Sequence, residues 1–298
     1  MPHYLQLFLD GYAGYAGYLW HEITHPGWHN YFYWLVAVSA FFFAVEWMRP
    51  WHRQQGRFRK DFWLDFFYMF FNFFLFSLVV YNAVANVAVE AFGDLLGLVG
   101  VTNLVALEVS AWPVWAQLVT LFVVRDFIHW NVHVLLHRVP WLWEFHKVHH
   151  SVGEMGFAAH LRFHWMENIV YRVIEYVPLA MIGFGIDDFF VVHIFALVVG
   201  HFNHSNLHVP LGPLKYVLNG PQMHIWHHAK HLPPEHPHGV NFGLTLSVWD
   251  YLFRTDYIPY EGRDIPLGFP GDEDFPQTFA AQNLHGLRRP RRRDTASV

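Results

Sequence analysis

The chain has 298 residues, of which 54% are hydrophobic, 19% are aromatic and only 14% are charged. Soluble domains carry about 25% charged residues, so this composition is typical of a membrane protein. The 19 Lys plus Arg nearly balance the 24 Asp plus Glu, and no basic stripe runs through the body, which excludes a typical nucleic-acid-binding protein. Because the chain has no cysteine, it can form neither a disulfide nor an iron–sulfur cluster.

Apolar segments in the first half of the chain predict membrane helices. The first 30 residues lack the basic and continuous apolar regions of a signal peptide, so insertion is expected from internal segments. Residues 31–47 and 66–89 are long and apolar enough to cross a bilayer core of about 30 Å. Residues 109–124 are slightly short, and they suffice only if the helix continues through Arg125 and Asp126 into the first histidine pair.

A fourth apolar region, residues 169–200, is interrupted by glycines and aspartates, which predicts a hairpin of two short helices. Basic residues gather in the loop 49–60, whereas residues 91–108 contain no Lys or Arg. The positive-inside rule therefore places the loop 49–60, and with it the histidine-rich region described next, on the cytoplasmic side.

The predicted fold is all-α. It is an integral membrane bundle of about four to five transmembrane or hairpin helices, with a cytosolic histidine-rich helical cap. We expect N-terminal membrane helices in residues 1–110, a catalytic region in residues 111–270 that is continuous with them, and a flexible basic tail in residues 271–298.

Histidines in the second half form four clusters with the spacings Hx3H, HxxHH, Hx3H and HxxHH. Positions i, i+3 and i+4 share one face of a helix, so each cluster can aim its imidazoles at a common point. Ten imidazoles are too many for one ion, whereas two ions with about five each would use them. The predicted metal ligands are His133, His137, His146, His149, His150, His204, His208, His224, His227 and His228.

These motifs resemble the fatty acid hydroxylase and sterol desaturase superfamily of integral-membrane non-haem iron enzymes. The run from Asp126 to Ser151, with its Pro-Trp-Leu-Trp turn, resembles the first two histidine boxes of that family. Residues 204–213 and 221–228 resemble the later boxes, and residues 241–253 resemble the end of the catalytic domain. The resemblance covers about residues 120–258. It implies two iron ions that use O2 to hydroxylate or desaturate an unactivated C–H bond of a membrane lipid.

The chain also departs from the family pattern. Val134 stands where many members have Arg, and His129 where many have Tyr. Many bacterial relatives have Arg at the position of His208, and His201 competes for the same role. The stretch around Arg162, His164 and Glu167 resembles an Arg-x-His-Pro-x-Glu motif, so His164, like His160, is expected to support the ligands and not to bind metal.

Other groups complete the predicted site. Candidates to orient the imidazoles through their second ring nitrogen are Asp126, Glu144, Asn203 and Asn206. With neither cysteine nor a dinucleotide-binding motif, the chain needs a separate electron donor of the ferredoxin or cytochrome type with its reductase. The basic loop 49–60 could receive such a donor.

Two other functions compete with lipid oxidation. A metal transporter would disperse its ligands through several spans near the membrane midplane, whereas these clusters adjoin charged segments at helix ends. A zinc-dependent hydrolase would need about three protein ligands and a general base such as Glu144 or Glu154. Imidazole alone suits Fe, Zn, Cu or Ni, and no motif separates hydroxylation from desaturation or selects the lipid.

Overall fold

A computed structural model describes residues 2–76, 109–176 and 186–287, together with a few isolated positions between them. Its described part is helical, and the β pairing found there consists of two isolated bridges, Leu218 with Leu246 and Ala229 with Leu267. The predicted all-α fold is therefore confirmed for these residues.

The described helices follow one another along the chain with turns and loops between them. The α-helices are α1 (Pro2–Thr24), α2 (Tyr31–Met48), α3 (Phe62–Phe70), α5 (Val114–Arg138), α6 (Pro140–His150), α7 (Trp165–Tyr171), α9 (Ile186–His204), α10 (Pro221–His227), α11 (Val248–Phe253) and α12 (Phe279–Asn283). Two π-helical segments, η1 (Phe71–Leu75) and η5 (Arg172–Tyr176), continue α3 and α7. The 3-10 segments are η3 (Val109–Ala111), η4 (Phe157–Leu161), η6 (Gly212–Tyr216) and η7 (Asp272–Asp274).

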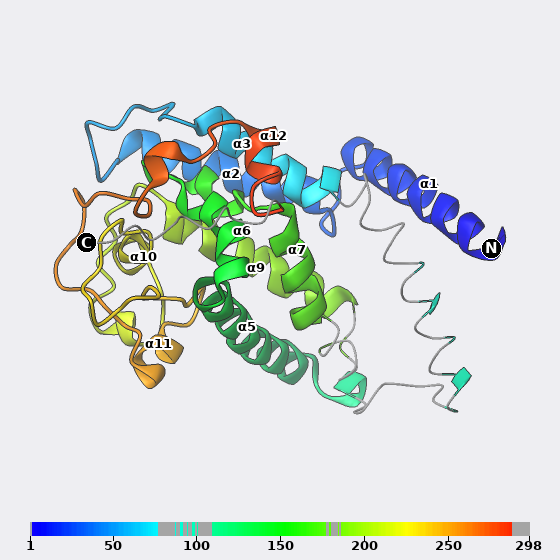
Figure 1. Ribbon diagram of the computed structural model, residues 1–298. Helices are drawn as coiled ribbons and strands as arrows, with labels where there is room; N and C mark the ends of the chain where they lie inside the picture. The colour runs from blue at the N-terminus through cyan, green and yellow to red at the C-terminus, as the bar shows by residue number, and fades with distance from the viewer. Residues whose placement is uncertain are drawn as a thin grey trace.

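Helix α9 lies at the centre of the body, where it packs against α2, α5, α10 and η4. Helix α1 projects away from this body, and α5 runs along its lower side (Figure 1). A buried apolar cluster joins α1, α2, α3, η4 and α9 through Leu19, Leu35, Phe62, Phe157 and Leu197. The histidine-bearing helices α5, α6, α9 and α10 are thus held by one packed body.

A proline sets the angle between α5 and α6, the two helices that carry the first five of the ten predicted ligands. Val139 has an extended backbone, and Pro140 occupies the first turn of α6. Because proline lacks an N–H group and disfavours a helical residue before it, α5 cannot continue past Arg138. Helix α6 instead turns back onto α5, which brings the histidines of both helices together.

Among the described residues, two helices are long and apolar enough to cross a membrane, α2 with 18 residues and α5 with 25 residues. Helix α2 confirms the helix predicted over residues 31–47. Helix α5 runs without interruption through Arg125 and Asp126 to His137, as predicted. Of the region 66–89, the structure describes α3, η1 and Phe76 as helical, and most of the remainder lies outside the described residues. The same holds for the loop 91–108 and for the turn of the predicted hairpin, whose flanks are helical.

The first part of the expected flexible tail is packed. Phe275, Gln282 and Asn283 are buried. The Tyr68 hydroxyl donates to Gln282 Oε1 at 3.0 Å, and the Asn283 amide donates to the Tyr68 oxygen at 2.9 Å. These polar anchors attach residues 272–287 to α3, which composition alone did not reveal. Residues 288–298 lie outside the described part.

Candidate metal centre

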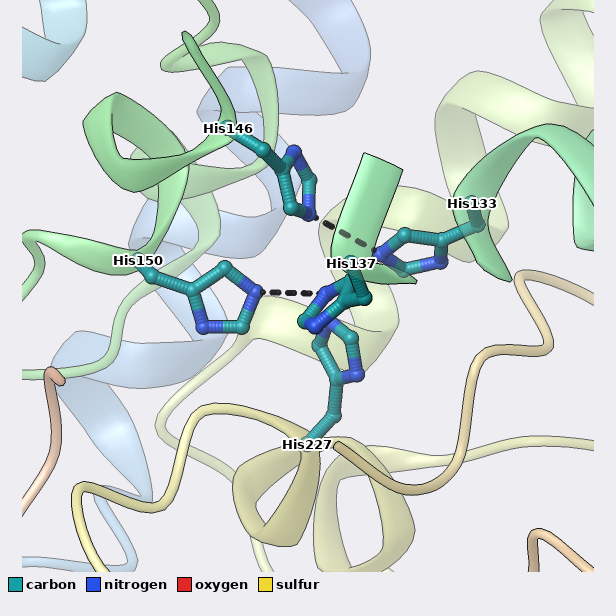
Figure 2. Close-up of side chains that lie close together, drawn as sticks. All are labelled: His133, His137, His146, His150 and His227. Atoms are coloured by element: carbon teal, nitrogen blue, oxygen red, sulfur yellow. Dashed lines mark hydrogen bonds between the residues drawn. The ribbon is translucent and has the colours of Figure 1, made fainter. Parts of the chain in front are cut away.

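Nine of the ten predicted ligands form two compact groups. Group one joins two histidines of α5 with two of α6 and one of α10, and their candidate ligand atoms lie within 4.8 Å of one another. Figure 2 shows the five imidazoles converging from these helices on one region. The members of group one are His133, His137, His146, His150 and His227.

Group two lies beside group one. It combines one histidine of α6, the last residue of α9 and two histidines at the end of α10, again with ligand atoms within 4.8 Å of one another. Its members are His149, His204, His224 and His228. All four are buried.

Each HxxHH cluster is divided between the groups. In α6, the i, i+4 pair His146 and His150 belongs to group one, while His149 belongs to group two. In α10 the division is reversed, because His224 and His228 belong to group two and His227 to group one. The expectation that a whole cluster aims at one point is therefore corrected. A helix rotates by about 100° per residue, so the i+3 side chain diverges enough to reach a neighbouring centre.

The spacing of the imidazole nitrogens fits shared ions. In group one, the Nε2 atoms of His133 and His146 are 3.2 Å apart, and those of His137 and His150 are 3.1 Å apart. In group two, the Nε2 atom of His204 lies 3.2 Å from that of His149 and 3.0 Å from that of His224. Two nitrogens at right angles, each about 2.1 Å from one ion, would be about 3 Å apart.

In five of the nine histidines, the Nδ1 atom makes a hydrogen bond that points the other ring nitrogen inward. His133, His204 and His227 donate from Nδ1 to the carbonyl oxygens of Phe242, Gly200 and Val240 at 2.7–2.8 Å. His146 Nδ1 lies 2.7 Å from Glu167 Oε2, and His149 Nδ1 lies 3.3 Å from the Arg162 carbonyl oxygen. This arrangement leaves the Nε2 lone pairs for a metal and fixes the ring orientations.

His227 gives the clearest evidence that a ligand belongs here. Its Nε2 atom is buried and has no hydrogen-bond partner, a costly state for a polar atom. Burial lowers the pKa of His227 to about 4, so the ring is neutral at pH 7, which is the form that binds metals. Burial also raises the pKa of the Glu167 carboxyl to about 8, and a cation on the far side of His146 would offset that cost.

His208 does not join either group. Helix α9 ends at His204, so the Hx3H spacing no longer places the second histidine on the same helix face. The His208 side chain is 44% exposed and pairs with Glu261 at 2.6 Å. Its ring also stacks on Trp51. The sequence carried a signal for this break, because Asn206 and Pro210 disfavour helix continuation.

The three remaining candidate histidines lie outside the groups. His160 and His201 face each other through their Nδ1 atoms at 2.9 Å, and His201 Nε2 lies 3.1 Å from the Ser39 hydroxyl. His164 caps α7 by accepting from Met166 N at 3.1 Å and donates to the Asn283 carbonyl oxygen at 2.9 Å. Burial lowers the pKa of His164 to about 4, which keeps Nδ1 available as the capping acceptor.

The four predicted orienting groups have other partners. Asp126 accepts from the backbone N–H groups of Thr245 and Leu246 and from the Trp249 indole. Glu144 pairs with Lys147 and His285. Asn203 donates to the Leu244 carbonyl, and Asn206 bonds to the His52 backbone. Glu167 and backbone carbonyls orient five of the imidazoles instead. The stretch with Glu167 stood out in the sequence, whereas a carbonyl can come from any residue type and leaves no side-chain pattern.

One cavity reaches histidines of both groups. It has a volume of about 620 Å³ and is lined by His133 and His146 of group one and by His149, His204 and His224 of group two. Leu161, Phe163 and Leu197 form part of its apolar wall. A molecule in this cavity could therefore approach both centres.

The contact between Glu167 and His146 leads to a prediction. We expect Glu167→Gln to weaken metal binding in group one by about 10- to 100-fold, the usual effect of losing a partner that orients a ligand. The measurement is metal retention during dialysis against graded chelator concentrations. Glu144→Gln is the matched control, because Glu144 lies in α6 but contacts Lys147 and His285. Equal metal retention in both variants would contradict the assignment.

Two adjacent histidine groups that could each hold a metal ion therefore lie in a helical body, and two of its described helices are long and apolar enough to cross a membrane. The comparison of sequences agrees, because residues 118–255 match the family described as fatty acid hydroxylase. The match includes all ten predicted ligand histidines and agrees with the resemblance seen in the motifs.

Several characterised proteins are similar to the chain. Ornithine lipid hydroxylase OlsE of Rhizobium tropici is 30% identical over 54% of this chain and 47% of its own length. Alkylglycerol monooxygenase of Xenopus tropicalis is 31% identical over 59% of this chain and 37% of its own length. Methylsterol monooxygenase 1-2 of Arabidopsis thaliana is 26% identical over 49% of this chain and 48% of its own length. The chain thus covers less than half of each of these relatives. No solved structure matches it.

Proposed function

We propose that the chain oxidises an unactivated C–H bond of a membrane lipid with O2, by hydroxylation or by desaturation. The observation that carries this proposal is the pair of buried histidine groups that share one largely apolar cavity. The names of the similar proteins, two lipid monooxygenases and a lipid hydroxylase, support it.

Iron is the proposed metal, one ion in each group. Zinc has no redox chemistry, whereas bound iron would supply the activation of O2 that attack on a C–H bond requires. The nine histidines of groups one and two would hold the ions, and Glu167 and backbone carbonyls fix the rings of five of them. The cavity wall of Leu161, Phe163 and Leu197 would hold hydrocarbon and exclude water.

We further propose the membrane arrangement expected above, with about four to five spanning or hairpin helices and the histidine cap in the cytoplasm. An electron donor of the ferredoxin or cytochrome type would dock there, on the exposed basic residues Arg49, Arg53, Arg57 and Lys60. Arg59 takes no part in such a surface, because it is buried in an ion pair with Asp65.

The two competing functions fit the geometry less well. A transport path would spread its ligands along the membrane normal, but nine imidazoles lie in two compact groups. A hydrolytic zinc site uses about three protein ligands, fewer than either group offers. Glu144, the candidate general base, pairs with Lys147 and His285, which leaves it poorly placed to activate water.

The test is turnover with isotopically labelled O2. Iron-loaded protein in nanodiscs of lipids from its host membrane is given a ferredoxin, its reductase and NADPH, and the lipids are analysed by mass spectrometry. Hydroxylation places one labelled oxygen atom in the product, whereas desaturation removes two hydrogens without adding label. The proposal would be overturned if the lipids showed neither change and a zinc-loaded sample hydrolysed lipid without reductant.

A further inference from the structure

The cavity beside the metal groups has a polar patch within its largely apolar wall. Arg125 and His129 of α5 line it together with Glu175 of η5. Arg125 Nε lies 2.5 Å from Glu175 Oε1, and His129 Nδ1 lies 3.1 Å from Glu175 Oε2. One carboxylate therefore holds an arginine and a histidine at the cavity surface.

Helix α5 fixes how far this patch lies from the metal centre. His129 precedes the group-one histidine His133 by four residues, which corresponds to about 6 Å along the helix. Arg125 lies a further turn away, at about 12 Å. Residues spaced by four share a helix face, so His133, His129 and Arg125 follow one another along the cavity wall.

Placing these groups in a helix long and apolar enough to span a membrane is costly. Arg125 and Glu175 are both buried, and ionisable side chains at such depth usually serve a ligand or a pathway. Glu175 lies in one π-helical segment and Asn72, which also lines the cavity, lies in the other. Short π-helical segments are frequent at functional sites, so both departures from regular helix turn polar side chains toward the same space.

The hydrogen bonds define which atom of the patch can bind a ligand. His129 Nδ1 faces Glu175 Oε2. The tautomer with its proton on Nδ1 donates to this carboxylate and carries an acceptor lone pair on Nε2. The ring is held in place by stacking on Tyr171, with centroids 4.5 Å apart and planes 16° apart.

We propose that His129 Nε2 accepts a hydrogen bond from a hydroxyl or amino group of the lipid substrate. The oxidised carbon would then lie about one helical turn from that polar group, close to the head of the lipid and far from the end of a hydrocarbon tail. This inference rests on the proposed lipid oxidation for the fate of the carbon, but the binding step can be measured without turnover.

The experiment measures binding to the purified full-length protein in nanodiscs, without reductant so that no turnover occurs. The probes are a radiolabelled alkylglycerol with free hydroxyl groups, its di-O-methyl ether and its amino analogue. We expect the wild-type protein to bind the hydroxyl or amino probe roughly 2- to 12-fold more tightly than the ether, the worth of one net hydrogen bond. His129→Phe keeps the stacked ring but loses the acceptor, so its preference should fall to about one.

Two further variants make the result decisive. His129→Gln restores an acceptor and should recover part of the preference, whichever of the two donor groups is bound. His193→Phe removes another histidine of the same cavity and should retain the wild-type preference. An unchanged preference in His129→Phe, or a loss in His193→Phe alone, would overturn the proposal. Absence of lipid oxidation in the labelled-O2 assay, with the His129 preference intact, would overturn the proposed activity and leave this binding site standing.

Discussion

Replacing His227 by alanine is expected to remove the metal of group one and leave that of group two. Replacing His149 by alanine should do the reverse, because the two residues belong to different groups. Each variant should lose more than about 100-fold in activity. Loss of a residue that only hydrogen-bonds a metal ligand already costs about 10- to 100-fold, and loss of the ligand itself should cost more. Elemental analysis of the purified variants, with turnover measured on the same samples, checks both statements.

The control for these variants is His208→Ala. His208 lies outside both groups and pairs with Glu261 near the surface. We expect this variant to retain both metals and its activity, in contrast to the ligand role that the histidine spacing predicted. Full metal content in His227→Ala and His149→Ala, or metal loss in His208→Ala, would contradict the two-group assignment.

The second large effect is expected for Asp250→Ala. The buried Asp250 carboxylate accepts from the Trp130 indole at 3.0 Å, from the Thr255 hydroxyl at 2.6 Å and from the Phe242 and Gly243 backbone at 2.9 and 2.8 Å. Alanine would leave these donors without their acceptor, at about 1–3 kcal/mol for each that stays buried and unpaired. We therefore expect the free energy of unfolding to fall by about 3 kcal/mol or more.

The same substitution should also weaken metal binding in group one. Asp250 fixes the segment whose Val240 and Phe242 carbonyls orient His227 and His133. Denaturant unfolding in detergent and metal analysis together test this coupling. Asp264→Ala is the matched control, because Asp264 is exposed and pairs with its neighbour Arg263, an arrangement worth little. Similar stability and metal content in the two variants would contradict the role of Asp250.

The histidine spacing predicted much of the site because helix periodicity is local. Two HxxHH clusters, the pair in α5 and His204 of the second Hx3H pair predicted nine imidazoles that the structure brings together. Periodicity could not predict how one cluster is divided, since that depends on how α6 and α10 sit against each other. Periodicity gave the wrong prediction at His208 because α9 ends four residues earlier, at His204. Helix-breaking residues indicate the end of a helix only approximately.

The supporting interactions were much harder to predict. His133 bonds to the carbonyl of Phe242, 109 residues away along the chain, and any residue type can supply a carbonyl. Asp126 was named from the sequence as an orienting group, but it supports the backbone at Thr245 and Leu246. The packed segment that includes Gln282 and Asn283 was also missed, because its attachment depends on Tyr68, 214 and 215 residues earlier in the chain.

The central claim is that the two histidine groups hold two iron ions. Its most direct test is elemental analysis of detergent-purified protein, combined with Mössbauer spectroscopy after growth on enriched iron. We predict two irons per chain in nitrogen-rich coordination, with one lost in His227→Ala and one in His149→Ala. Stoichiometric zinc after iron-replete growth, or no bound metal at all, would contradict the claim.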